Sequence, residues 1–329
     1  MRAAIYDQYG GAEVLSVREV ADPPVGPDTV LVRARATSVN PVDWKIREGY
    51  LQGAYPHHLP IIPGWDVAGV VEAVGPAVRT GVKVGDEVFG YVRRDDVAFG
   101  TTAELVPAPE RTVARKPDGL SFAEAAALPL AGMTAYQCLV EALDVQPGER
   151  VLIHAASGGV GHFAVQIAKA LGAHVIGTAG PDNQDWVRAL GADEVLDYTA
   201  GPISKQLDER VDAVVDLIGG DALQDAPEQV RDGARVVSVI DPDTVLEQGG
   251  HYVFVRPSRE NLQALTELVE SGKLSVTVAE TFDLDHTADA HRFSAGGHPR
   301  GKVVITLLAR RVSALAVRDR PARRRPRAR

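Results

Sequence analysis

A run of small residues between Ala156 and Gly161 carries the clearest chemical signal in the chain. It follows an apolar stretch, Arg150–Ala155, and leads into a segment of helical periodicity, Gly158–Leu171. Glycines in such a turn let backbone N–H groups approach a pyrophosphate, and the N-terminus of the helix adds positive potential. A purely structural turn is the alternative, and Ala or Ser replaces the first glycine of the usual fingerprint. The turn predicts a dinucleotide site made by Ser157, Gly158, Gly159, Val160 and Gly161.

The end of the next expected strand, His174–Thr178, indicates which dinucleotide is bound. NAD sites carry an acidic residue there that binds the ribose 2′-OH, and that carboxylate would repel the 2′-phosphate of NADP. This chain has no acid until Asp182, so we expect NADPH. Arg188 is the nearest cation in sequence, and it either binds the phosphate or is a solvated charge. The residues expected around this end of the cofactor are Thr178, Ala179, Asn183 and Tyr198.

These motifs lie on two kinds of secondary structure. Up to residue 115, short strands separated by glycine and proline predict an irregular β-rich domain; in Thr29–Ala36 apolar residues alternate with arginines. From Ser121, which forms a capping box with Glu124, strands and helices alternate. Near-continuous apolar strands such as Val211–Leu217 indicate a parallel sheet that is covered on both faces.

The second region is expected to contain six strands. They are Arg150–Ala155, His174–Thr178, Glu194–Leu196, Val211–Leu217, Arg235–Ile240 and Tyr252–Val255. The expected helices are Gly158–Leu171, Asn183–Leu190, Ile203–Leu207, Asp221–Val230 and Ser258–Ser271. The last strand, Gly301–Leu308, interrupts the alternation and is expected to return to the first domain. Because ligands bind at the carboxyl ends of parallel strands, the cofactor is expected beside Ile218, Val239, Ile240, Phe254 and Val255.

Seven segments spread over most of the chain carry a pattern that is more specific than the glycine-rich turn alone. They are Ala36–Gly49, Pro63–Gly75, Val84–Gly90, Ala127–Tyr136, His154–Gly161, Leu190–Tyr198 and Arg300–Ile305. Together they resemble the zinc-independent quinone oxidoreductase (zeta-crystallin-like) branch of the medium-chain dehydrogenase/reductase superfamily. The resemblance implies a split α/β fold with the active site in the cleft between two domains. A GroES-like β-barrel domain would comprise residues 1–120 and 275–309, and a Rossmann NADP-binding domain with a doubly wound parallel sheet would comprise residues 121–274.

The resemblance also bears on metal binding. Zinc-containing members of the superfamily hold the metal with a cysteine near Ser38 and a histidine in a Gly-His-Glu motif. This chain has Ser38 and Gly64-Trp65-Asp66 at those places, and it lacks the four-cysteine lobe that holds a structural zinc. Since thiolate ligands are missing, neither zinc site is expected and no metal ligand is predicted.

The same resemblance implies the residues that act on the substrate. Asn40 is expected beside the nicotinamide, although a plain turn residue before Pro41 is the alternative. Asp43 would hold the geometry of the cleft or cap the following helix. Tyr50 lies where related enoyl reductases carry a tyrosine that donates a proton, and Tyr55 is the second choice. The residues that match cofactor-contacting positions are Thr134, Gly301 and Lys302.

Composition and charge exclude several other classes of protein. The chain has 329 residues, and its single cysteine, Cys138, excludes a disulfide framework. No apolar run is long enough to span a membrane and no signal peptide is recognisable, so we expect a cytoplasmic protein. The net charge is −9, but residues 310–329 hold nine Arg and one Asp, hence +8. This tail is expected to be a disordered extension, with binding to nucleic acid or a membrane surface as the alternative, whereas the acidic body is not expected to bind nucleic acid.

We therefore expect an NADPH-dependent oxidoreductase that reduces quinones or α,β-unsaturated carbonyl compounds by hydride transfer without zinc. Asn40, a backbone N–H or a water would stabilise the developing negative charge, and Tyr50 or water would supply the proton. One alternative is a reductase dedicated to a single enone or ketone intermediate of a biosynthetic pathway. Another is a non-catalytic NADPH-binding protein. The expected partners are a small quinone or enone and a second copy of the chain, because relatives in the family are usually homodimers.

Overall fold

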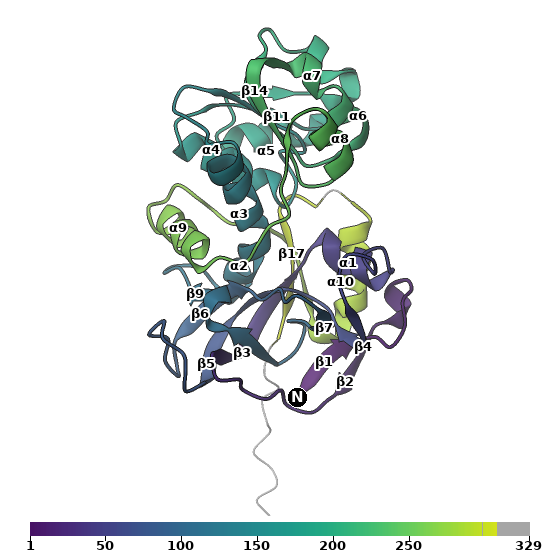
Figure 1. Ribbon diagram of the computed structural model, residues 1–329, viewed down its shortest axis with the longest axis vertical. Coiled ribbons are helices and arrows are strands. Elements are labelled where there is room, and N and C mark those ends of the chain that lie inside the picture. Colours follow the sequence, from purple (N-terminus) through teal and green to yellow (C-terminus); the bar gives the residue numbers. More distant parts are fainter. Residues whose placement is uncertain (298, 308–329) are drawn as a thin grey trace, which may run out of the picture.

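The chain folds into two lobes that are joined by helices (Figure 1). The computed structural model describes residues 1–297 and 299–307, so the tail predicted at residues 310–329 lies outside the described residues. Two central helices, α2 (Phe122–Ala127) and α3 (Pro129–Tyr136), lie between the lobes. The expected capping box starts α2: Glu124 N–H donates to Ser121 Oγ at 3.2 Å, and Ser121 N–H donates to Glu124 Oε2 at 2.8 Å.

The lower lobe in Figure 1 is built on a seven-stranded sheet. Its main path runs β16-β17-β3-β5-β6-β9, and β8 also pairs with β3. The strands are β3 (Thr29–Val39), β5 (Asp66–Val74), β6 (Glu87–Tyr91), β8 (Leu105–Pro109), β9 (Val113–Arg115), β16 (Val278–Asp283) and β17 (Lys302–Thr306). Two small sheets accompany it: β1 (Arg2–Ile5) with β2 (Ser16–Glu19), and β4 (His57–Ile62) with β7 (Val97–Phe99).

Strand β3 organises this lobe. The alternation noticed in the sequence is real, since Val30, Val32 and Ala34 are buried in the core while Arg33 is half-buried. On one side β3 pairs antiparallel with β17, so that Val303 lies opposite Val39. The last described strand therefore completes the first sheet, and it brings the start of β17 to the end of β3.

The upper lobe is built on a six-stranded parallel sheet of order β12-β11-β10-β13-β14-β15, which is the strand order of a Rossmann fold. The strands are β10 (Arg150–Ile153), β11 (His174–Thr178), β12 (Glu194–Leu196), β13 (Val211–Asp216), β14 (Val230–Ser238) and β15 (His251–Tyr252). The fold class is thus α/β, as predicted. We propose that the domain boundaries lie near residues 120 and 275. The pairing of β16 and β17 with the sheet of the lower lobe supports this division.

The remaining helices pack on the sheets of both lobes. They are α1 (Pro41–Arg47), α4 (Gly161–Ala170), α5 (Gln184–Ala189), α6 (Gly220–Gln224), α7 (Ala226–Gln229), α8 (Pro242–Glu247), α9 (Arg259–Glu270) and α10 (Thr287–Ala295). Short 3-10 turns lie at Ala12–Val14, Glu110–Thr112, Pro181–Asn183, Tyr198–Ala200, Ile203–Lys205 and Leu284–His286, and a π turn at Gln137–Ala142. Among the helices of the described residues, none combines the length and the apolar character that a membrane span requires.

Several element boundaries differ from the sequence prediction. The helix predicted to begin at Gly158 begins at Gly161, because the preceding residues form the turn itself. The strand predicted over Tyr252–Val255 is observed as β15. The N–H of Val253 still donates to the carbonyl oxygen of Ser238 at 2.9 Å, and only Phe254 and Val255 continue away from the sheet to the cavity between the lobes. The helix predicted over Asp221–Val230 is divided into α6 and α7, where Pro227 lies near the start of the second helix.

Candidate active site

The glycine-rich turn joins β10 to α4 at the carboxyl edge of the parallel sheet. Its shape depends on one close approach, because a Cβ on Gly161 would lie 2.1 Å from the carbonyl oxygen of Ala155. Ala155 has a φ of 48°, in the left-handed region, and its carbonyl accepts the N–H of Gly158 at 2.9 Å. Only glycine therefore fits at position 161 without a backbone shift. In a dinucleotide-binding turn the last glycine allows the helix to pack closely on the strand, and Gly161 fulfils this role here.

The start of β17 faces this turn from the other lobe. A Cβ on Gly159 would lie 3.3 Å from Cδ of Lys302 and 3.5 Å from the carbonyl oxygen of Gly301. Gly159 thus lies in close contact with the segment Gly301–Lys302, near the N-terminus of α4. A glycine-rich turn at such a place suits a pyrophosphate, since glycines leave the backbone N–H groups accessible and the helix end favours negative charge.

A cavity of about 240 Å³ lies between the two lobes at the end of the turn. Its walls are mostly apolar and include Leu51, Trp65 and Leu130. Thr134 Oγ1 donates to the carbonyl of Leu130 at 2.7 Å, so toward the cavity this hydroxyl is an acceptor. The cavity brings together seven predicted cofactor residues from both lobes: Asn40, Thr134, Val160, Val239, Ile240, Phe254 and Val255.

A second cavity, of about 410 Å³, lies at the carboxyl edge of the sheet on the other side of the turn. His154 lines this cavity and Val160 lines the first, so the glycine-rich turn separates the two. The predicted residues Thr178, Tyr198 and Ile218 line it. Two cavities on either side of a glycine-rich turn match the two halves of a dinucleotide.

A buried carboxylate holds the floor of the first cavity together. Asp66 is fully buried, and its oxygens accept three hydrogen bonds. The donors are Ser38 Oγ at 2.6 Å, Asn40 Nδ2 at 2.8 Å and the backbone N–H of Leu130 at 2.8 Å. Since Ser38 belongs to β3, Asn40 follows that strand directly and Leu130 belongs to α3, Asp66 connects the lower lobe to the central helix.

Lys302 completes the arrangement around Asn40. Its Nζ donates to Asn40 Oδ1, and to the carbonyl oxygen of Val39 at 3.2 Å. The Asn40 amide is therefore fixed, with its oxygen toward Lys302 and its nitrogen toward Asp66. Nδ2 has two hydrogens, of which one is used by Asp66, and the residue lines the cavity. Burial lowers the pKa of Lys302, while Asp66 and Asp43 act in the opposite direction and favour the charged ammonium.

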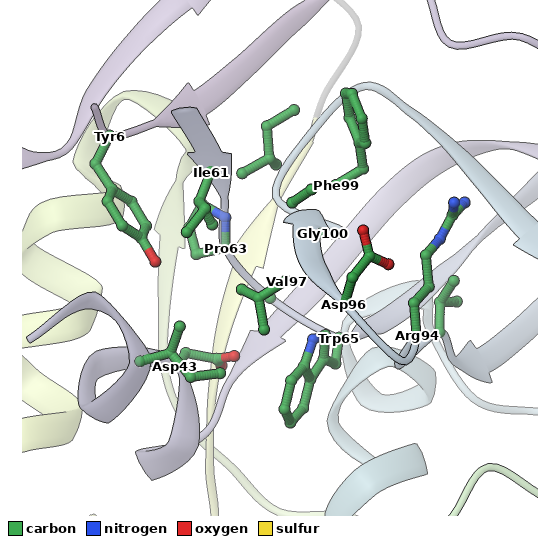
Figure 2. A pocket seen from close by; sticks show the side chains of 15 residues that line it. Tyr6, Asp43, Ile61, Pro63, Trp65, Arg94, Asp96, Val97, Phe99 and Gly100 are labelled. Atoms are coloured by element: carbon green, nitrogen blue, oxygen red, sulfur yellow. The ribbon is translucent and has the colours of Figure 1, made fainter. Parts of the chain in front are cut away.

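Asp43 supports Asn40 from behind. Its Oδ2 accepts the backbone N–H of Asn40 at 2.7 Å at the start of α1. Burial, with a contribution from the nearby Asp66 charge, raises the pKa of Asp43 to about 7. The carboxyl group does not line the large cavity; it borders a cavity of about 10 Å³, and Figure 2 shows the ring of Tyr6 directed toward it. The structure thus gives Asp43 the capping position and offers no contact with substrate.

Arg300 brings a cation to the end of β11. Its Nε donates to Asn183 Oδ1, and its terminal nitrogen donates to the carbonyl oxygen of Asp182 at 2.5 Å. Arg188, the nearer cation in sequence, is instead engaged with Asp185 at 2.8 Å and with Gln184 at 3.2 Å. The cation beside the expected 2′-phosphate therefore comes from the segment before β17.

Comparisons with known proteins agree with this geometry. Residues 26–118 match the family described as "Alcohol dehydrogenase GroES-like domain", and residues 190–305 match "Zinc-binding dehydrogenase". The chloroplast envelope quinone oxidoreductase homolog of Arabidopsis thaliana is 34% identical, over 93% of this chain and 98% of that protein. The chloroplastic NADPH-dependent alkenal/one oxidoreductase of the same plant is 36% identical, over 93% and 79%. The solved structure of the quinone oxidoreductase from Coxiella burnetii is 33% identical with a TM-score of 0.86, over 94% and 99%.

The chain belongs to the quinone oxidoreductase branch of the medium-chain dehydrogenase/reductase superfamily. The family resemblance inferred from the seven segments is thereby confirmed, and so is the combination of a GroES-like domain with a Rossmann sheet.

One matching family description mentions zinc, but the donor set in this member of the branch does not fit that ion. The oxygens of Asp66 already accept three protein hydrogen bonds, and a buried ammonium group, Lys302 Nζ, lies one hydrogen bond away at Asn40. Cys138, the one thiol of the chain, is buried between helices and absent from both cavities. Within residues 1–297 and 299–307 no cluster of three or more His, Cys, Asp or Glu could hold a metal.

Two predicted tyrosines are placed differently from the expectation for this branch. Tyr50 is 71% exposed and does not line the cavity, because it belongs to the turn after α1. The geometry therefore gives no support to Tyr50 as proton donor. Tyr55 is closer, with its hydroxyl accepting a hydrogen bond from Arg93 at 3.0 Å and its ring 5.9 Å from that of Phe254. Tyr55 is not among the residues that line the cavity, and its hydroxyl keeps its own hydrogen for donation.

The sequence prediction missed Tyr91, Trp65 and Lys45 as cavity residues. A signal for Tyr91 existed, since it directly follows the family segment Val84–Gly90. The remaining predicted residues are placed next to those described: Ser157 and Gly158 lie in the turn, and buried Ala179 follows Thr178 with its N–H on the carbonyl of Leu196 at 3.0 Å.

Proposed function

We propose that this protein reduces the activated double bond of a quinone or an α,β-unsaturated carbonyl compound with NADPH. The observation that carries the proposal is the apolar cavity of about 240 Å³ that joins Asn40 to Val160 of the glycine-rich turn. The names of the similar proteins, a quinone oxidoreductase homolog and an NADPH-dependent alkenal/one oxidoreductase, support the same class of reaction. When bound, NADPH supplies a hydride to an electrophilic carbon.

The protein's own contribution would be to position the reactants and to stabilise charge. The apolar walls exclude water and strengthen each polar contact inside the cavity. Asn40 would donate its second Nδ2 hydrogen to a carbonyl oxygen, and it needs little reorganisation because Lys302 and Asp66 already hold the amide. Thr134 would accept a hydrogen bond from a carboxamide. The proton that completes the product would come from water, as Tyr50 lies outside the cavity.

A preference for NADPH over NADH would rest on two features at the end of β11. The strand ends in Thr178 without a following acid until Asp182, and Arg300 reaches this place from the other lobe. An arginine recognises a phosphate group by charge-assisted hydrogen bonds. Asn183 and Tyr198 would complete the contacts, while Ser157, Gly158, Gly159 and Gly161 would surround the pyrophosphate.

The reaction would proceed without zinc. The oxygens of Asp66 support this, because they already accept three protein hydrogen bonds and lie near a buried cation, the ammonium group of Lys302. The carbonyl oxygen of the substrate would then depend on hydrogen-bond donors for its activation, rather than on a Lewis acid.

The experiment that tests the proposal is anaerobic oxidation of NADPH and NADH with four acceptors: 1,4-benzoquinone, 9,10-phenanthrenequinone, an alkyl enone and a 2-alkenal. We expect turnover with a preference for NADPH, and the ranking of acceptors separates quinone from enone chemistry. Tight NADPH binding without turnover on any acceptor would favour the alternative of one dedicated biosynthetic substrate. Absence of NADPH binding would refute the proposal.

We further propose that the protein is a homodimer located in the cytoplasm. Strand β15 forms one edge of the six-stranded sheet, which supports pairing of the two sheets edge to edge. Light scattering coupled to size exclusion would measure a mass of twice 35.0 kDa for the dimer.

A further inference from the structure

Tyr91, the last residue of β6, has a buried hydroxyl group without a partner. Its residue exposure is 0%, and among residues 1–297 and 299–307 no group forms a hydrogen bond with the hydroxyl. Buried tyrosine hydroxyls almost always find a partner, because burial of an unpaired polar group costs free energy. An unpaired hydroxyl that lines a cavity therefore indicates a ligand that supplies the missing partner.

The sheet register directs Tyr91 toward Asn40. Tyr91 of β6 lies directly opposite Asp66 of β5 in an antiparallel pair, and residues that are paired in this way project from the same face of the sheet. On that face the Asp66 carboxylate contacts Asn40 and the N–H of Leu130. Asn40, Leu130 and Tyr91 all line the same cavity of about 240 Å³. Tyr91 thus belongs to the same cavity lining as Asn40, with its hydroxyl buried behind the surface.

The surroundings keep this hydroxyl a hydrogen-bond donor. Burial raises the pKa of Tyr91 well above its usual range, and the Asp66 and Asp43 carboxylates raise it further, while Arg93 opposes them. The phenol therefore keeps its proton. The ring of Trp65 packs edge-on against Tyr91 with centroids 6.0 Å apart, and Tyr55 and Phe254 continue this aromatic wall toward the rim. A flat, conjugated acceptor fits between such rings.

We propose that Tyr91 is a catalytic residue whose hydroxyl donates a hydrogen bond to the carbonyl oxygen of the acceptor, together with Asn40. The inference rests on the proposed function. When an enone takes up a hydride at its β-carbon, the electron pair of the C=C bond moves and negative charge develops on that oxygen. A proton from water then adds at the α-carbon, so the product has gained one hydride and one proton while NADPH is oxidised to NADP⁺. Two donors on the oxygen would stabilise the enolate more than the ketone.

Substitution Tyr91→Phe separates this role from a structural one. Since the hydroxyl has no partner in the protein, its removal is expected to raise the Tm of the ligand-free protein, or to leave it unchanged. The Kd for NADPH is expected to stay within about twofold, whereas kcat/KM for an enone falls by about a hundredfold, the usual effect of losing one such donor. The loss should be smaller for 1,4-benzoquinone, because its reduced anion is already stable. A decrease in Tm, or an unchanged kcat/KM, would overturn the proposal.

Tyr6 provides a matched control, because it is also fully buried with an unpartnered hydroxyl. It borders the separate cavity of about 10 Å³ beside Asp43, where one water molecule fits (Figure 2). Tyr6→Phe makes the same chemical change outside the large cavity. We expect its kcat/KM to stay within about twofold of the unaltered protein. An equal loss in both variants would indicate a general effect of removing buried hydroxyls, and would contradict a role of Tyr91 at the acceptor.

A binding measurement distinguishes failure of this inference from failure of the proposed function. The saturated ketone 4-phenylbutan-2-one, the product expected from 4-phenylbut-3-en-2-one, is titrated into the NADP⁺-loaded protein. Weaker binding to Tyr91→Phe by about fivefold or more, a normal loss for one hydrogen bond, supports the contact even if no acceptor is turned over. Equal binding to both proteins refutes the contact, whether or not the unaltered protein reduces the enone.

Discussion

The ammonium group of Lys302 donates a hydrogen bond to the side-chain oxygen of Asn40, 262 positions earlier in the chain. The bond joins the first residue of β17 to the residue that follows β3, and it exists because these strands pair. It also sets which way the Asn40 amide faces, so that Nδ2 meets Asp66. A buried ammonium group thus fixes the amide of a residue that lines the large cavity.

Substitution of Lys302 by Met tests this relationship. The change leaves Asn40 Oδ1 and the buried Asp66 without the cation, so we expect the free energy of unfolding to fall by about 3 to 5 kcal/mol, as for other broken buried pairs. Urea denaturation measures the loss. Lys169→Met is the control, because Lys169 forms a partly exposed ion pair with Asp193 at 2.8 Å and its loss should cost less than about 1 kcal/mol. Similar losses in the two variants would contradict the role of Lys302.

Asp43→Asn tests the buried carboxyl group through pH. The pKa of Asp43 is raised to about 7 in the folded protein, mainly by burial. A raised pKa means that the contribution of this group to stability is complete below its unfolded value, near 4, and is lost as the pH rises through about 7. We therefore expect the free energy of unfolding of the unaltered protein to decrease relative to that of Asp43→Asn between about pH 5 and pH 8. Parallel pH curves, from urea denaturation at both ends of this range, would contradict the shifted pKa.

Arg300→Gln tests the selectivity for the cofactor. If Arg300 meets the 2′-phosphate, the KM for NADPH should rise by about tenfold while the KM for NADH stays the same, because only NADPH carries that group. Arg188→Gln is the matched control, since Arg188 is engaged with Asp185 and should change neither value by more than about twofold. Equal weakening of both cofactors in Arg300→Gln would show that this arginine acts on the fold of the cleft and not on the phosphate.

Gly161→Ala tests the packing of the glycine-rich turn. The new Cβ would lie 2.1 Å from the carbonyl oxygen of Ala155, which is backbone and cannot move aside alone. We expect a loss of about 3 kcal/mol or more of stability, together with weaker NADPH binding. Gly53→Ala is the control, because its Cβ would meet no atom within 4 Å and should change stability by less than about 0.5 kcal/mol. A Gly161→Ala protein with an unchanged Tm would contradict the close approach.

The parts of the structure that depend on neighbouring residues could be predicted from the sequence. The turn at Gly161, the capping box at Ser121 and strands such as β11 and β12 follow from local spacing and apolar patterns. The parallel sheet followed from continuous apolar strands, which only a sheet covered on both faces can bury. The apolar pattern did not predict where each strand ends. Strand β15 is shorter than its apolar run, because Phe254 and Val255 line the cavity instead of continuing the strand.

The contacts that determine the chemistry could not be predicted in this way. Arg300 meets Asn183 across 117 positions, and no local pattern relates the two. The role of Tyr91 depends on its register with Asp66, which is fixed only when β5 and β6 pair. Tyr50 was expected at the substrate because related enoyl reductases carry a tyrosine at that place, whereas the turn after α1 leaves it 71% exposed and outside the lining of the cavity. The path of this turn decides whether the side chain of Tyr50 reaches the cavity, and no local sequence pattern determines that path.

The central claim is that the cavity beside Asn40 supports hydride transfer from NADPH to an activated double bond. It is tested most directly by following the hydride itself. NADPH deuterated at C4 is incubated with 4-phenylbut-3-en-2-one, and the product is analysed by mass spectrometry and NMR. We predict that one deuterium is transferred from one face of the nicotinamide to the β-carbon, so that the product is a saturated ketone with a single deuterium at that carbon. Deuterium on the carbonyl carbon of an alcohol, or a saturated ketone without deuterium, would contradict the account.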